Sequence, residues 1–114
     1  MPFIDTKTTE KISEDKKRSI TKKLGEAITL INGKSEEWLM LNFEPECKMA
    51  YRGDTEGKFA FVDVKILGSA KSEEYDALTA RITEIISEEL GISPSGIYIS
   101  YFEASVWGYN GANF

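Results

Sequence analysis

The chain has 114 residues and a mass of 12.8 kDa, which fits one domain over residues 1–114. Hydrophobic residues make up 41% and charged residues 29%, a balance typical of globular proteins rather than disordered chains. The formal net charge is −5, so the chain offers little to a phosphate backbone, and nucleic acid is disfavoured as a partner.

The chain contains one cysteine, Cys47, and no histidine. A single thiol excludes an internal disulfide framework and any multi-cysteine metal site. The absence of histidine removes Ser–His and Cys–His catalysis and the commonest zinc ligand. We therefore expect no metal and no cofactor, and acid–base chemistry near neutral pH must use a less usual group.

No apolar run approaches the roughly 18 residues of a membrane span. The amino-terminal residues carry charge early and lack the apolar segment of a signal peptide. We therefore expect no membrane contact and a cytoplasmic location.

The first half of the chain predicts a strand, a helix and then two strands. The first strand is expected over residues 2–9. Ser13 is a candidate helix N-cap, and Gly33 is a candidate for the residue that ends the helix. The apolar residues of this helix recur at helical spacing: Ile20, Leu24, Ala27, Ile28 and Ile31. Strands are expected over residues 37–43 and, more briefly, 47–51.

The second half repeats the pattern. Alternating apolar residues predict a strand over residues 59–66. A second helix is expected to begin at Ser72 and to end at Gly91. Its apolar stripe consists of Tyr75, Leu78, Ile82, Ile85 and Ile86. A turn then leads to a strand over residues 97–102 and to an aromatic, glycine-rich tail over residues 106–114.

The predicted order is a duplicated β-α-β unit of the α/β (α+β) class, with pseudo-repeats over about residues 1–57 and 58–114. Two helices on one face of a four-stranded mixed sheet leave the other face uncovered. That face is expected to carry these residues or their alternating partners: Trp38, Met40, Phe61, Tyr98 and Phe102. Because a soluble monomer rarely exposes so large an apolar patch, we expect it to be buried between subunits.

Five sequence features in order carry a resemblance to a known family. They are Met1-Pro2, Gly33-Lys34, Leu67-Gly68, Ile92-Ser93-Pro94 before Ile97-Tyr98-Ile99, and Trp107-Gly108-Tyr109-Asn110-Gly111 before Phe114. Over its whole length the chain resembles the macrophage migration inhibitory factor family of the tautomerase superfamily. The resemblance implies a homotrimer around a central barrel, with active sites at the subunit interfaces. It also implies a phenylpyruvate tautomerase-like isomerase that acts on small aryl 2-keto acids.

The family uses an amino-terminal proline as its catalytic base, which corresponds here to Pro2 once Met1 is removed. An α-amino group titrates near ~7.7–8, and burial or a nearby cation lowers that pKa toward neutrality. Such a group suits proton abstraction next to a carbonyl. From its position alone, Pro2 could equally be only the rigid first residue of a strand.

The resemblance also assigns the residues that bind substrate. Lys34 would hold the substrate carboxylate, although a lysine after a helix is also favourable for the helix dipole alone. The backbone N–H of Leu67 would help, and Tyr98 would reach in from a neighbouring subunit, although alone it would be an ordinary cross-strand aromatic. Ser100 would stand at the rim, in place of an asparagine of the vertebrate proteins. The apolar walls would be Phe3, Val106, Tyr109 and Phe114, with Trp107 as an alternative to Tyr109.

Two other functions stay open. One is a cytokine-like protein that binds a host receptor after leaving its cell by an unconventional route. The other is a relative that dehalogenates or decarboxylates small acids. Such relatives surround the proline with arginines, which this sequence does not predict here, so this function ranks third. Residues 59–62 lack a CxxC motif, so no thiol–disulfide activity is expected.

Overall fold

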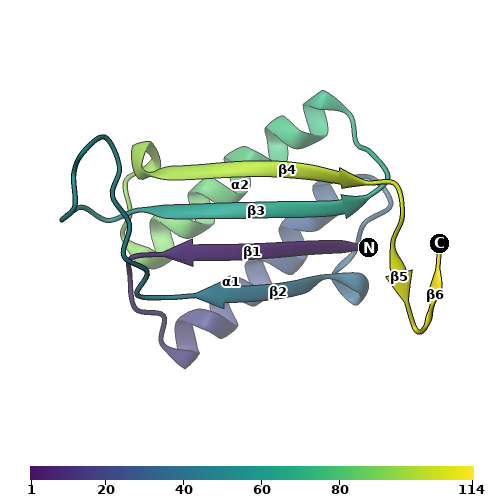
Figure 1. The fold of residues 1–114 in the computed structure, drawn as a ribbon, viewed down its shortest axis with the longest axis horizontal. Helices are drawn as coiled ribbons and strands as arrows, with labels where there is room; N and C mark the ends of the chain where they lie inside the picture. The colour runs from purple at the N-terminus through teal and green to yellow at the C-terminus, as the bar shows by residue number, and fades with distance from the viewer.

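A computed structural model describes all residues of the chain, 1–114. Its four long strands are β1 (Pro2–Thr8), β2 (Met40–Glu44), β3 (Ala60–Leu67) and β4 (Ile97–Ala104). They form one sheet in the order β2-β1-β3-β4, with the two helices on one face (Figure 1). Each half contributes a parallel pair, and β1 runs antiparallel to β3. The predicted fold class is therefore confirmed.

Helix α1 (Glu14–Ala27) begins as the sequence predicts. The Ser13 hydroxyl oxygen accepts a hydrogen bond from the backbone N–H of Lys16 at 3.1 Å, which satisfies one free donor of the first turn. The helix ends earlier than predicted, because the chain tightens into a 3-10 turn, η1 (Ile28–Leu30). Gly33 lies beyond this turn with a φ of +82°, so it forms the following loop rather than the helix terminus.

Helix α2 (Ser72–Leu90) begins at Ser72, as the sequence predicts. Lys71 is its N-cap, and the backbone N–H of Lys71 donates to Glu74 Oε1 at 2.9 Å. Gly91 ends the helix in the left-handed conformation, as predicted. Neither α1 nor α2 combines the length and the apolar character that a membrane-crossing helix needs.

The hydrophobic core fills the space between the sheet and the two helices. It contains the predicted apolar stripes of both helices together with the inward residues of β1, β3 and β4. Its largest fully buried side chains are Ile4, Ile20, Leu24, Ile28, Ile31, Val62, Ile66, Leu78, Ile82, Ile85, Ile86 and Ile92.

The uncovered face of the sheet faces the viewer in Figure 1. Paired strand positions arrange its side chains in three rows that cross all four strands. The first row is Met40, Phe3, Lys65 and Phe102, the second is Asn42, Asp5, Asp63 and Ser100, and the third is Glu44, Lys7, Phe61 and Tyr98. Apolar side chains therefore lie at the two ends of this face, and its centre is polar, which the sequence analysis did not foresee.

Two segments differ from their predictions, and the tail forms a structure that the sequence did not predict. Trp38 does not lie in a strand, because Glu36–Trp38 forms a 3-10 turn, η2, before β2 begins. Residues 47–51 do not form a strand, since Glu46 has a φ of +56° and only a single bridge joins Tyr51 to Asp54. The tail forms a small hairpin of β5 (Gly108–Tyr109) and β6 (Ala112–Asn113).

One ion cluster links the two helices. The Glu89 carboxylate of α2 accepts hydrogen bonds from Ser19 Oγ and Lys23 Nζ of α1, both at 2.7 Å. Lys16 Nζ lies 3.4 Å from its second oxygen. The Glu89 side chain is only 8% exposed. The hydrogen bond from Lys23, followed by that from Ser19, lowers the pKa of Glu89 to about 2.

We predict that Glu89→Gln lowers the free energy of unfolding by about 1–2 kcal/mol at pH 7, because the helices lose a charge-assisted contact. The folded-state pKa lies below the unfolded value, so this stabilisation is present above about pH 4.5 and disappears as pH falls toward 2. Urea unfolding at pH 7 and pH 3, at one protein concentration, measures both effects. Glu88→Gln, at an exposed position without an ion pair, is the control. Equal losses in the two variants would contradict the assignment.

Candidate active site

A cavity of about 640 Å³ opens at the end of the sheet where β1 begins and β3 ends. Figure 1 shows the amino terminus of β1 and the tail hairpin β5-β6 at this same end. Seven of the cavity's 11 lining residues are hydrophobic. The full lining is Met1, Pro2, Phe3, Glu37, Trp38, Leu39, Met40, Lys65, Trp107, Gly108 and Tyr109. Pro2 is itself buried and pairs with Ile66 of β3. The cavity therefore gathers four separate segments of the chain around the first strand residue.

Lys34 and Leu67 stand beside the amino terminus. Lys34 Nζ donates a hydrogen bond to the backbone carbonyl of Leu67 at 2.8 Å. The backbone N–H of Leu67 donates in turn to the carbonyl of Met1 at 3.1 Å. The structure thus brings Pro2, Lys34 and Leu67 together. The Leu67 N–H is already hydrogen-bonded to the carbonyl of Met1.

A glycine turn places Lys34 at this position. Gly33 adopts a φ of +82°, which glycine tolerates because it has no Cβ. The backbone N–H of Lys34 then bonds to the carbonyl of Ile31 at 3.1 Å, which closes the turn. The side chain consequently reaches the end of β3 rather than continuing along the helix axis.

The site lowers the basicity of an amine placed in it. Burial, followed by the charge of Lys34 and its hydrogen bond, lowers the pKa of the Met1 amine to about 6. Burial and the neighbouring ammonium both disfavour a second positive charge. With a pKa of about 6, the Met1 amine is mostly neutral at pH 7.

Aromatic rings form the outer wall of the cavity. Trp38 of η2 packs edge-on against Tyr109 of β5, with ring centroids 5.3 Å apart. The tail hairpin holds Tyr109 there through a turn in which Asn110 and Gly111 have φ values of +52° and +83°. Such a two-residue turn is typical of tight hairpins. The wall therefore joins the loop after α1 to the last residues of the chain.

The predicted wall residues are only partly brought together. Phe3 and Tyr109 line the cavity, and so does Trp107, so both tail aromatics that the sequence offered contribute. Val106 and Phe114 do not line it and are 64% and 63% exposed. Phe114 instead stacks on Tyr109, with ring centroids 6.2 Å apart.

Tyr98 and Ser100 lie away from this cavity. Tyr98 pairs with Phe61, five residues along β3 from the Ile66 partner of Pro2. At about 3.3 Å per residue, this separates Tyr98 from Pro2 by roughly 16 Å. Ser100 belongs to the central polar row and donates to Asp63 Oδ1 at 2.6 Å. Within one chain, neither residue reaches Pro2.

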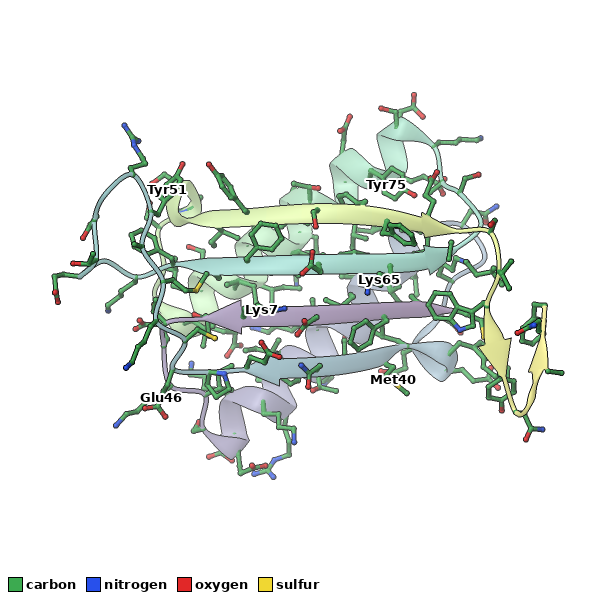
Figure 2. All side chains as sticks on the ribbon, in the orientation of Figure 1. Lys7, Met40, Glu46, Tyr51, Lys65 and Tyr75 are labelled. Carbon is green, nitrogen blue, oxygen red and sulfur yellow. The ribbon has the colours of Figure 1, made fainter.

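Sequence reasoning missed several lining residues, among them Trp38, Glu37 and Lys65. Trp38 was placed in a strand, and Glu37 and Lys65 were assigned no role. Figure 2 shows Lys65 and Met40 at the same end of the open face. The alternation of β3 could have placed Lys65 on the face opposite the core, because Val64 and Ile66 are buried. Only the register with β1, which sets Lys65 beside Phe3, shows that it belongs to the cavity.

Solved structures with this fold include MIF2 of Leishmania major, similar over 100% of this chain and 97% of its own, with 28% identity and a TM-score of 0.93. A macrophage migration inhibitory factor homologue from Prochlorococcus marinus is 26% identical over 98% of both chains, with a TM-score of 0.81. A fused 4-OT, described as a symmetric trimer, is 16% identical over 96% of this chain and 94% of its own, with a TM-score of 0.85. No curated protein matches the chain in sequence.

These structures share the duplicated β-α-β fold of the chain, which is the fold of the tautomerase superfamily. The family model of macrophage migration inhibitory factor matches residues 1–114, and the chain belongs to that family. Members of this family are commonly tautomerases. The resemblance seen in the sequence is thus confirmed over the full chain.

Both tryptophans of the chain, Trp38 and Trp107, line the cavity. We therefore predict that phenylacetate, a small aromatic carboxylate, changes the tryptophan emission in a saturable way as it enters. Fluorescence titration measures this change, and Trp38→Phe should reduce its amplitude while Trp107 still reports binding. A change that rises linearly without saturation would show that the cavity does not bind this class of molecule.

Proposed function

We propose that the protein is a keto–enol tautomerase of phenylpyruvate-like aryl 2-keto acids and that the free amine of Pro2 is its general base and acid. The observation that carries the proposal is the position of Pro2, buried in a largely apolar cavity beside the Lys34 ammonium. In a chain without histidine, a secondary amine of lowered pKa is a group suited to move protons at neutral pH.

Removal of Met1 has two consequences for this chemistry. The nitrogen of Pro2 changes from an amide, which is not basic, to an amine. The N–H of Leu67, which bonds to the Met1 carbonyl, becomes free. The Met1 carbonyl oxygen stands where an oxygen of a bound carboxylate would accept that hydrogen bond. Lys34, next to Leu67, supplies the matching positive charge.

The reaction then needs two proton transfers at one amine. Neutral Pro2 accepts a proton from the carbon next to the keto group and becomes a secondary ammonium. The electrons left behind form an enolate, whose oxygen then receives the proton from Pro2 to give the enol. Lys34 and the Leu67 amide hold the carboxylate, and the Tyr98 hydroxyl of a neighbouring subunit stabilises the developing oxyanion. Phe3, Trp38, Trp107 and Tyr109 exclude water and pack against the aryl ring.

Tyr98 and Ser100 can contribute only if another copy of the chain carries them to the cavity. Each site would then lie between subunits, and the open sheet faces would line the barrel of a homotrimer. The fused 4-OT with the same fold is described as a symmetric trimer, which supports this arrangement. Apolar side chains are exposed at both ends of the open face, for example Phe102 at one end and Tyr98 at the other, and burial between subunits would cover them.

The other two functions are less well supported. No arginine lines the cavity: Arg18 and Arg81 lie on the helices, paired with Asp15 and Glu84. This disfavours a dehalogenase or decarboxylase that depends on arginines around the proline. A cytokine-like role requires a receptor surface, and no side-chain arrangement identifies one here.

Our first prediction for this function concerns the Pro2 amine. An amino-terminal fusion that is later cleaved to expose Pro2 should have no phenylpyruvate tautomerase activity before cleavage and full activity after it. Pro2→Gly should lower kcat/KM by at least about 100-fold, the scale of general-base catalysis. The enol absorbance follows the reaction, intact mass confirms the amino terminus, and sedimentation confirms three chains. Equal turnover before and after cleavage would refute the role of Pro2.

The second prediction concerns the pH dependence. Because the base must be neutral, kcat/KM should rise with pH and level off above the pKa of the Pro2 amine, which burial and the charge of Lys34 are expected to lower. Lys34→Gln removes this cation, so the acidic limb should move to higher pH and KM should rise. Lys17→Gln, on the exposed surface of α1, is the control for the loss of one positive charge. An acidic limb that stays in place would show that Lys34 does not act on Pro2.

A further inference from the structure

Aromatic side chains gather at the end of the sheet opposite the cavity. We call Tyr51, Phe59, Phe61 and Tyr98 the far-end aromatic cluster. Their rings meet edge-on, with centroid distances of 5.6 Å for Tyr51 and Phe59, 5.1 Å for Tyr51 and Tyr98, and 6.1 Å for Phe61 and Tyr98. They line a small hollow of about 130 Å³. The side chain of Tyr98 therefore packs within a group of aromatic rings.

One hydrogen bond in this cluster joins two hydroxyls. The Tyr98 hydroxyl donates to the Tyr51 hydroxyl oxygen at 3.1 Å. Tyr98 as a whole is 54% exposed. This bond, together with burial, raises the pKa of Tyr98, while the charge of Arg52 acts in the opposite direction. The hydroxyl of Tyr98 has no other hydrogen-bond partner in the chain.

The Tyr51 backbone is held by its own tight turn. The N–H of Tyr51 donates to the Asp54 carbonyl at 3.0 Å, and the N–H of Asp54 donates back at 2.9 Å. Arg52 and Gly53 between them have positive φ values, as a two-residue hairpin requires. Figure 2 shows Tyr51 beside the start of β4, far from Lys65 at the cavity end. The turn therefore holds Tyr51 in a position from which its hydroxyl can orient Tyr98.

We propose that Tyr51 is a positioning residue, whose hydroxyl orients the Tyr98 hydroxyl and supports it as the hydrogen-bond donor to substrate at Pro2 of a neighbouring subunit. This inference rests on the proposed function. A tyrosine hydroxyl both donates and accepts. When Tyr98 turns its proton toward the substrate oxygen, its own oxygen can accept the proton of Tyr51. The two bonds then polarise each other, and the Tyr98 ring loses less freedom when the enolate forms.

The test is a double-mutant cycle of Tyr51 and Tyr98, measured by phenylpyruvate turnover on protein with an exposed Pro2. Tyr51→Phe removes the hydroxyl and keeps the ring, so the aromatic packing stays. We expect kcat to fall about three- to tenfold, the scale of one neutral hydrogen bond, with KM changed less than about twofold. In the Tyr98→Phe background the same change should have no further effect, because Tyr51 acts only through Tyr98. Tyr75→Phe on α2 loses a 2.6 Å hydrogen bond to Glu103 of β4 and should leave kcat unchanged.

The outcomes separate this inference from the function on which it rests. Wild-type turnover that is lost in Pro2→Gly but unchanged in Tyr51→Phe would overturn the role of Tyr51 alone. An equal loss from Tyr51→Phe with and without the Tyr98 hydroxyl would also overturn it. Absence of turnover by the wild-type protein with Pro2 exposed would overturn both.

A second measurement does not depend on activity. With ring-labelled tyrosine, an NMR titration follows the pKa of Tyr98, which the bond to Tyr51 raises. Tyr51→Phe should move this pKa down, toward the usual value of ~10, because the hydrogen bond is gone. An unchanged Tyr98 pKa would show that the two hydroxyls do not interact, and the positioning role would fall.

Discussion

The antiparallel pairing of β1 with β3 joins the two β-α-β units, and the location of the site depends on its register. It sets Pro2 opposite Ile66, so the residue before Pro2 meets Leu67 and the Lys34 side chain. A slip of one residue would turn Ile4 toward the open face and Asp5 toward the core. The core therefore specifies the register, and the register in turn places the amine, the cation and the cavity at one corner.

The same pairing sets two aspartates, Asp5 and Asp63, directly opposite each other on the open face. Like charges in this position are unfavourable in isolation. Lys7 Nζ lies 2.6 Å from Asp5 and 3.8 Å from Asp63, and Ser100 donates to Asp63. The charges of the polar row are thus balanced by ion pairs and a hydrogen bond within the single chain.

The fold followed from the sequence where a pattern repeats often enough to be distinctive. The two amphipathic helices and the alternating strands β1, β3 and β4 were found in this way. The strand predicted over residues 47–51 is absent: the composition suits a strand, but Glu46 is left-handed and the only bridge in this segment joins Tyr51 to Asp54. Composition does not reveal which sheet edge is available. For the site, the resemblance supplied Pro2, Lys34 and Leu67, whereas Trp38 and Lys65 required the loop geometry and the strand register.

Both ends of the chain converge on the cavity, since Met1 lines it and the tail hairpin forms its wall. An affinity tag or fluorescent protein fused at either end would therefore stand in the path of a ligand. A dye or surface tether is better attached to the exposed outer surface of α1, for example at Lys17 or Lys22. Attachment there keeps the cavity, the far-end aromatic cluster and the open sheet face free for single-molecule or immobilisation work.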